Sequence, residues 1–229
     1  MASQKQSRKE LLEEPDPVTL TLNRIAAFFV AYWKPIVSVV AAVLAVIAAV
    51  SAFFYYRHQA EEDAALLFTR AMTHYEAVQA GNGSAGEYGE VKENFRDILE
   101  NYGNTDVADM ALVQYASACY KNGDLEEAVA AYEKALSRMP RGHEFREMAV
   151  NGLAYAYLEQ GDRENAIRYF EMIANNPEAA TRDHALFNLA QLYAYMGDRE
   201  KSREAYEKIL ADHPDSIYYD LARTKLADQ

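Results

Sequence analysis

Few residues in this chain have types and spacing that could support chemistry, and the first candidate is a glycine-rich stretch. Gly81-Asn82-Gly83-Ser84-Ala85-Gly86 matches the spacing GxGxxG, in which glycines let a backbone approach a dinucleotide pyrophosphate. That chemistry requires a preceding β-strand and a helix that opens at the glycines. The residues on both sides are helical in pattern, so we interpret the stretch as a loop between two helices.

The histidines and the single cysteine form no catalytic or metal-binding pattern in the sequence. His143 to Glu147 (HEFRE) lacks the second histidine of the zinc motif HExxH, and the other histidines are scattered without ligand spacing. Cys119 has no second cysteine to pair with, and we expect it to be a buried packing residue. The sequence therefore predicts a protein that is not an enzyme and holds no cofactor or metal.

The strongest pattern is a block that occurs three times in the C-terminal half, each copy centred on a Gly-Asp pair. An alanine precedes each glycine by seven residues, a small residue follows after five, an aromatic after nine, and a proline closes the block. In this order the copies are Ala116, Gly123, Ala128, Tyr132, Pro140; Ala154, Gly161, Ala166, Phe170, Pro177; and Ala190, Gly197, Ser202, Tyr206, Pro214.

Such a pattern predicts pairs of antiparallel helices. Small side chains let two helices approach closely, and the aromatic fills the space beside the contact. Glycine ends the first helix in a left-handed conformation and proline ends the second. We expect helical pairs at about 109–140, 147–177 and 183–214, and a terminal helix at 216–227 whose Ile217, Leu221 and Leu226 cover the last pair.

An earlier, degenerate copy is expected at 59–103. Gly86, Val91, Phe95 and Ile98 fall at the offsets of the glycine, small, aromatic and following apolar positions, and the first helix of this copy would run from Glu61 to Gln79.

The series of small, glycine, small, aromatic and proline residues resembles the tetratricopeptide repeat (TPR), whose period is about 34 residues. The resemblance implies an all-α fold in which residues 57–229 form an α-solenoid with a concave groove lined mainly by the first helix of each pair. Carried over copy by copy, the groove residues are Met110, Val113, Gln114, Ser117 and Tyr120; Met148, Asn151, Tyr155 and Leu158; and His184, Phe187, Asn188, Gln191 and Tyr195.

These groove residues are aromatic, aliphatic and amide side chains. Family members that clamp a C-terminal carboxylate use Lys and Arg at such positions, whereas here only Lys121 lies near. The groove therefore favours extended, partly apolar segments, with amides bonding the backbone and methionines adapting to varied side chains. The alternative is that these residues pack against neighbouring repeats and bind nothing.

Ile36 to Tyr56 has neither charge nor proline, and its 21 residues match the roughly 30 Å of a bilayer core. Tyr32 and Trp33 at one edge, and Phe53 to Tyr56 at the other, are typical of interfacial anchors. We expect an N-terminal transmembrane helix, with a cleaved signal peptide as the alternative. A stripe of small residues is a candidate helix-packing face in the membrane: Ser38, Ala41, Ala42, Ala45, Ala48, Ala49 and Ala52.

Residues 1–35 are expected to be a cytoplasmic tail, because five cations precede the span and few follow it. Its apolar stretch Leu20 to Trp33 is expected to lie along the membrane surface as an interfacial amphipathic helix, broken from the span at Lys34-Pro35. The repeats would then be periplasmic, on the bacterial inner membrane. The formal net charge of −12 argues against a nucleic-acid partner, and helix-dipole and solubility roles suffice for carboxylates such as Glu127.

Taken whole, the chain resembles the ancillary Sec-translocon-subunit family. The resemblance rests on the tail residues Leu11 to Pro15, the apolar span, its continuation from Arg57 to Tyr75, and the repeats. It implies a membrane-anchored adaptor or chaperone beside the translocon, with translocon subunits and periplasmic chaperones as partners. Two alternatives remain: a scaffold whose solenoids self-associate or organise an envelope or respiratory complex, and a mitochondrial import receptor with cytosolic repeats.

Overall fold

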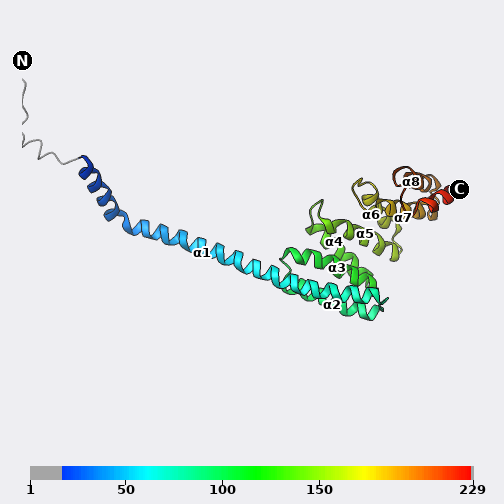
Figure 1. Cartoon of the computed structure of the whole chain (residues 1–229), viewed down its shortest axis with the longest axis horizontal. Helices are drawn as coiled ribbons and strands as arrows, with labels where there is room; N and C mark the ends of the chain where they lie inside the picture. The colour runs from blue at the N-terminus through cyan, green and yellow to red at the C-terminus, as the bar shows by residue number, and fades with distance from the viewer. Residues whose placement is uncertain (1–16, 228–229) are drawn as a thin grey trace, which may run out of the picture. The chain divides into compact units, whose positions relative to one another are not determined.

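A computed structural model of the chain describes residues 17–227, and every element within that range is a helix (Figure 1). The helices are α1 (Pro17–Ala80), α2 (Ala85–Asn101), α3 (Asp106–Asn122), α4 (Leu125–Arg138), α5 (Glu144–Glu159), α6 (Arg163–Ala174), α7 (Arg182–Tyr195), α8 (Arg199–Asp212) and α9 (Tyr219–Ala227). The expectation of an all-α chain is confirmed for these residues. The tail residues Leu11 to Pro15 lie outside the described range.

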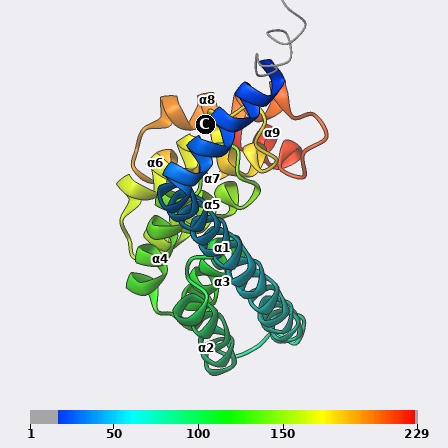
Figure 2. The same ribbon diagram turned by 90° about the vertical axis from the view of Figure 1, so that its left-hand side faces the viewer.

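Two compact units divide the chain at Tyr56 and Arg57. In the second unit each helix from α2 onward packs against its successor, so that α3–α4, α5–α6 and α7–α8 form consecutive hairpins (Figure 2). The three predicted glycines, Gly123, Gly161 and Gly197, come at the ends of α3, α5 and α7. Their φ values are 91°, 82° and 84°. The three predicted repeats are therefore present as helical pairs.

The predicted small and aromatic positions form the contact between the helices of these hairpins. The six small residues are all 0% exposed: Ala116, Ala154, Ala190, Ala128, Ala166 and Ser202. The aromatics Tyr132, Phe170 and Tyr206 are buried beside them. Close packing of small residues around one large ring per repeat thus holds each hairpin together.

The degenerate first copy pairs the end of α1 with α2. Val91, Phe95 and Ile98 are buried as predicted, and the Phe95 ring lies 6.0 Å from that of Phe68 and 6.4 Å from that of Tyr75 on α1. Gly86, however, is wrong as the turn glycine, because it lies within α2. The turn occupies residues 81–84, and Ser84 with Glu87 forms a capping box at the start of α2.

The C-terminal helix α9 begins later than expected. Its Ala222 is buried and Leu226 packs against the core, but Ile217 and Leu221 are 83% and 51% exposed, so the prediction that they cover the last pair is wrong. Residues 213–218 form turns instead, with the Ser216 N–H donating to the His213 carbonyl and the Tyr219 N–H to the Ser216 carbonyl. These turns delay the start of the helix to Tyr219.

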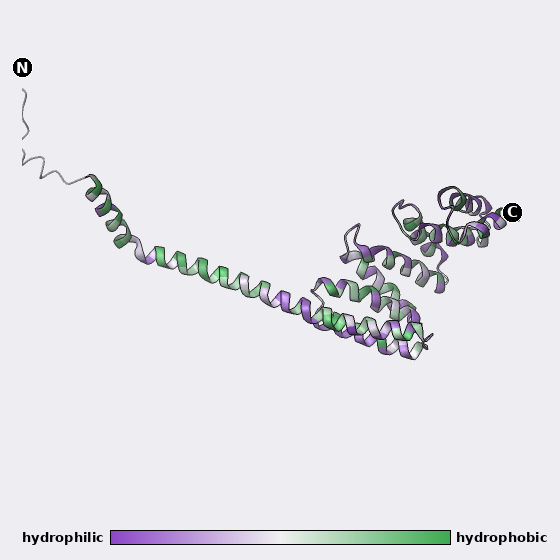
Figure 3. Cartoon of the chain, viewed as in Figure 1, coloured by the Kyte–Doolittle hydropathy of each residue, from purple (hydrophilic) through white to green (hydrophobic). Residues whose placement is uncertain are grey.

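Helix α1 continues through Pro35, so the break predicted at Lys34-Pro35 is also wrong. A proline removes its own backbone donor and crowds the carbonyl four residues earlier, but the helix is continuous on both sides of Pro35, and the Ser38 hydroxyl adds a 2.9 Å hydrogen bond to the Lys34 carbonyl nearby. Within the described residues, α1 is the helix long and apolar enough to cross a membrane, judged by length and composition. Hydrophobic colour gathers in its N-terminal part (Figure 3), and its most apolar window has no buried residue.

A substitution at Gly152 tests how tightly the hairpins pack. A Cβ atom there would overlap the ring of Tyr132 and lie 2.5 Å from its hydroxyl oxygen. We expect Gly152→Ala to lower the free energy of unfolding by about 1–3 kcal/mol through overpacking. The matched control is Gly86→Ala, where a Cβ meets nothing within 4 Å and the helix gains about 0.5–1 kcal/mol. Urea unfolding followed by circular dichroism measures both; equal stabilisation by the two changes would contradict the packing.

Candidate protein-binding groove

The structure brings together the predicted groove residues on α3, α5 and α7, the first helices of the three hairpins. Met148, Gln191 and Tyr195 are exposed, while Met110, Tyr120, Asn151, Tyr155, Leu158, His184, Phe187 and Asn188 are half-buried. Val113 and Gln114, by contrast, are buried at 0% and 6% exposure, so they cannot contact a partner. Helix α3 packs against α2, α4 and α5, and these neighbours leave little of its surface free.

A ladder of rings crosses the groove from α6 to α8. The Tyr155 ring lies 5.3 Å from Phe170 and 5.8 Å from His184. Beyond His184 stands Tyr218, whose ring is 5.5 Å from His184 and 4.6 Å from Phe187 in stacked geometry. Sequence reasoning missed Tyr218; the available signal was an aromatic four residues after the closing Pro214, where Thr181 follows Pro177.

Hydrogen bonds fix the polar atoms of this ladder. Tyr155 Oη and His184 Nε2 are 2.7 Å apart, and the Asn188 amide donates to Tyr155 Oη at 3.1 Å and to the His184 carbonyl at 2.9 Å. Burial lowers the pKa of His184, although the nearby Asp183 carboxylate opposes this, and the imidazole tautomer decides which of Tyr155 Oη and His184 Nε2 donates. In the described residues Asn151 Oδ1 has no hydrogen-bond donor, which makes it the unsatisfied acceptor of the groove.

Carboxylates on α1, α5 and α7 reach the next repeat. Glu61 accepts the Asp106 and Val107 N–H groups at 3.0 and 2.9 Å. Glu147 accepts the Thr181 N–H and hydroxyl at 3.0 and 2.6 Å, and Asp183 accepts the Ser216 hydroxyl at 2.5 Å. These bonds satisfy donors at helix starts and fix the spacing between repeats. A solubility role is therefore too narrow for them.

A second set of charges joins α2 to the α3–α4 hairpin. Lys92 Nζ bonds Asp124 and lies 3.1 Å from Glu127, whose other oxygen is 3.2 Å from Arg96 and also accepts the Tyr115 hydroxyl proton. Hydrogen bonds from the Tyr115 hydroxyl and the Lys92 ammonium hold the pKa of Glu127 below its usual value, although burial acts in the opposite direction. Hydrogen bonds from Lys92 and Asn122 lower the pKa of Asp124 in the same way. The expectation that helix-dipole and solubility roles suffice for Glu127 is thus wrong.

Cys119 is buried as predicted, and burial raises the pKa of its thiol to about 12. This thiol is therefore a packing group and not a nucleophile. The glycine-rich residues 81–84 form the turn between α1 and α2, with Ala85 and Gly86 already helical.

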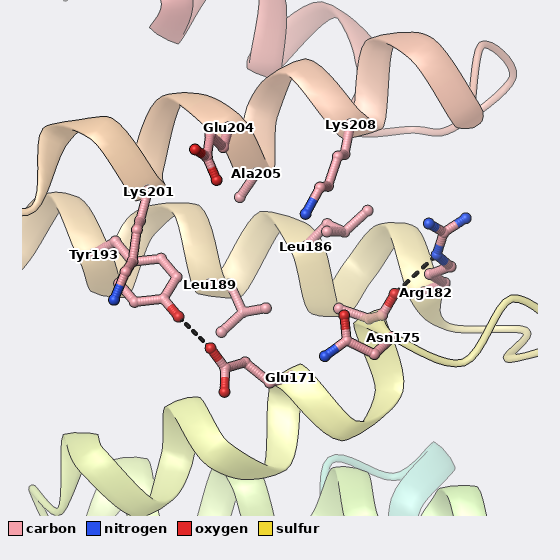
Figure 4. Close-up of a pocket in the computed structure, with 11 residues that line it drawn as sticks. Glu171, Asn175, Arg182, Leu186, Leu189, Tyr193, Lys201, Glu204, Ala205 and Lys208 are labelled. Atoms are coloured by element: carbon pink, nitrogen blue, oxygen red, sulfur yellow. Dashed lines mark hydrogen bonds between the residues drawn. The ribbon is translucent and has the colours of Figure 1, made fainter.

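A separate cavity of about 320 Å³ lies among α6, α7 and α8 (Figure 4). Leu186 and Leu189 contribute its apolar surface, while Lys201, Lys208 and Glu204 extend from α8. The Tyr193 hydroxyl donates to Glu171 at 2.6 Å across this cavity and ties α7 to α6. Charges of both signs line it, and among the described residues no cluster of His, Cys, Asp and Glu could hold a metal ion.

Stacked helical hairpins with a side-chain groove define an α-solenoid, a class whose members act as protein-interaction scaffolds. The family model described as "Tetratricopeptide repeat-like domain" matches residues 26–228, and the chain belongs to this family. Its fold is typically a non-catalytic interaction module, so protein partners follow from the family.

Relatives with this fold are diverse. The chain is 30% identical over 138 residues to the pre-mRNA-splicing factor clf1 of Aspergillus fumigatus. The aligned region makes up 55% of this chain but only 19% of that relative. A tetratricopeptide repeat protein of Parabacteroides merdae has a TM-score of 0.58 at 21% identity, covering 73% of this chain and 59% of that one. MamA has a TM-score of 0.51 at 20% identity, covering 71% and 85%. Both solved structures share the fold.

Removing the ammonium at the centre of the α2–α4 contact tests its contribution. We expect Lys92→Met to lower the free energy of unfolding at pH 7 by about 1–3 kcal/mol, because Asp124 and Glu127 lose their cation. Lys134→Met on the exposed side of α4 is the control and should change stability by less than about 0.5 kcal/mol.

The pH dependence of the free energy of unfolding tests the same ion pairs. Folded-state pKa values of Asp124 and Glu127 lie below their unfolded values of about 3.9 and 4.3. Their stabilisation is therefore complete above about pH 5 and is lost as the pH falls through the folded-state values. The stability difference between wild type and Lys92→Met should shrink between pH 7 and about pH 3.5 in urea titrations; a constant difference argues against these ion pairs.

Proposed function

We propose that this protein is a non-enzymatic, membrane-anchored TPR adaptor or chaperone that binds extended polypeptide segments in the groove of α3, α5 and α7. The proposed membrane anchoring is supported by helix α1. Its apolar window is unburied, and apolar surface of that extent requires a lipid or protein environment. A soluble core helix would be covered by its own chain.

The proposed span is Ile36 to Tyr56, with Tyr32 and Trp33 at the cytoplasmic interface. The cations that precede the span favour a cytoplasmic N-terminus and a periplasmic solenoid on the bacterial inner membrane. The same helix continues to Ala80, and its residues Ala64, Ala71 and Tyr75 are buried in the first repeat. The proposed span and the first helix of the solenoid would then belong to one helix.

The groove chemistry supports an extended, partly apolar partner. Met148 is exposed and adaptable, and the Gln114 amide lies 3.7 Å from its sulfur. Asn151 Oδ1 is buried as well as unpaired, so the amide open to a partner's backbone is that of the exposed Gln191. Because the groove positions carry no cation from Lys or Arg, we propose clients that are neutral or basic where they meet it. Phosphate backbones do not fit such a surface.

A place beside the Sec translocon rests on the whole-chain resemblance, with translocon subunits and periplasmic chaperones as proposed partners. The second candidate is a structural scaffold of an envelope or respiratory complex, including self-association. Its supporting observation is the exposure of Ile217 and Leu221 at the start of α9, because apolar residues at a solenoid end favour a folded neighbour.

Protease accessibility tests the topology. Protease added to spheroplasts should digest residues 57–229, because the periplasmic face is then open, and protease added to inverted inner-membrane vesicles should leave them intact. Immunoblots of both preparations read the result. Digestion only in the inverted vesicles reverses the proposed orientation, and recovery of residues 57–229 as a soluble fragment points to a cleaved signal peptide.

A matched methionine pair tests the groove. Met148 and Met172 are 46% and 45% exposed, but only Met148 lies on a groove helix. A photo-crosslinking amino acid at Gln191 captures clients in native membranes. We expect Met148→Glu to reduce the crosslinked product at least about fivefold, since a carboxylate desolvated against an apolar segment costs more than about 1 kcal/mol. Met172→Glu should leave it unchanged; equal effects of the two variants contradict the groove.

A further inference from the structure

The distal end of the groove holds a segment of the chain itself. The Tyr218 ring stacks on Phe187 at 4.6 Å with an interplanar angle of 21°, and on His184 at 5.5 Å with 14°. Both partners lie on α7 and are groove positions. A ring that a client could offer to this part of the groove would meet Tyr218 already in place.

This occupancy is particular to the last repeat. The residues four positions after the three closing prolines are Glu144, Thr181 and Tyr218. Thr181 bonds Glu147 on the preceding first helix through its backbone and hydroxyl. In the last repeat, Ser216 makes the corresponding bond by donating to Asp183 on the preceding first helix. The Tyr218 side chain instead places its ring over α7. The repeat pattern therefore does not require an aromatic side chain there.

Residues Ser216 to Tyr218 contact α7 as a bound peptide would. The Ser216 hydroxyl donates to Asp183 Oδ2 at 2.5 Å, the Tyr218 ring stacks two residues later, and Ile217 between them is 83% exposed. The segment itself is a turn, in which the Tyr218 N–H donates to Ser216 Oγ at 3.0 Å and the Tyr219 N–H donates to the Ser216 carbonyl at 3.0 Å, so the two side chains that face α7 are presented from a compact loop. Helix α9 is docked through the buried Ala222, whose N–H bonds the Tyr218 carbonyl, so only the Tyr218 side chain has to turn away for the ring to leave the groove.

We propose that Asp183, His184 and Phe187 form a subsite for a client segment with a hydroxyl side chain two residues before an aromatic one, and that Ser216–Tyr218 is an internal occupant that competes for it. This inference rests on the proposed groove function and adds both ligand chemistry and regulation. The hydroxyl donates to the Asp183 carboxylate and the aromatic ring stacks on the His184 and Phe187 rings. An acidic residue in place of the hydroxyl is repelled by Asp183.

Competition sets the apparent affinity. A client binds only the fraction of molecules from which Tyr218 has withdrawn, so the apparent dissociation constant is the intrinsic constant divided by that fraction. If the ring occupies the subsite in about 90% of molecules, its removal tightens client binding about tenfold. Clients with weaker aromatic residues are then excluded until the internal ring leaves.

The test uses the full chain in lipid nanodiscs and a fluorescent synthetic peptide that copies residues 212–219, DHPDSIYY. Fluorescence anisotropy should show Tyr218→Ala binding this peptide at least about tenfold tighter than wild type does. Tyr219→Ala, one residue along and outside the ring ladder, should bind it as wild type does.

Changes in the peptide avoid any effect on folding of the protein. Peptides with the Tyr218→Ala or the Ser216→Ala change should each lose at least about tenfold in affinity for the Tyr218→Ala protein. The inference is overturned if Tyr218→Ala binds the copy no tighter than wild type, or if both altered peptides bind as well as the copy. If client crosslinking still depends on Met148 in that case, the groove function stands and only this inference fails. If crosslinking does not depend on Met148 while Tyr218→Ala binds the peptide more tightly, the proposed groove function alone is wrong.

Discussion

Contact between small side chains on adjacent helices is the constraint on which the rest of the solenoid depends. Ala116, Ala154 and Ala190 leave no space between paired helices, and the one large ring of each repeat fills what remains. Gly152 against Tyr132 extends the same close approach from one hairpin to the next. A single hairpin cannot bury these surfaces alone, so the fold exists only as an array. The groove follows, because fixed helix spacing leaves a regular row of side chains on α3, α5 and α7.

Polar contacts then decide how successive hairpins are aligned. Packing of alanines is nearly indifferent to small sliding motions, whereas a carboxylate that bonds the start of the next helix has one correct position. Glu61, Glu147 and Asp183 each make such a bond to the following repeat. The Lys92–Glu127 contact does the same between α2 and α4. These carboxylates are half-buried, and each would lose its hydrogen-bond partner in any other alignment.

The repeats could be predicted from sequence because every local signal agreed: glycine at the first helix end, proline after the second, and small residues at fixed offsets. Predictions failed where a single local signal stood alone. Pro35 removes one backbone donor but does not end α1, although the helix around it is mostly exposed. Val113 has the offset of a groove residue, yet α3 is covered on several sides. Tyr218 could not be placed, since its partners His184 and Phe187 are near only after the chain turns back.

The ring ladder makes the two ends of the groove chemically different. At the α5 end, Met148 is exposed, so an incoming segment gains apolar contact there without displacing anything. At the α7 end every ring already has a partner, and the Asn188 amide is engaged by Tyr155. Binding energy is therefore available first near Met148, and engagement of α7 requires an exchange of one aromatic ring for another. Such an exchange costs little area, since rings of similar size replace each other, and it selects clients by the position of an aromatic residue rather than by charge.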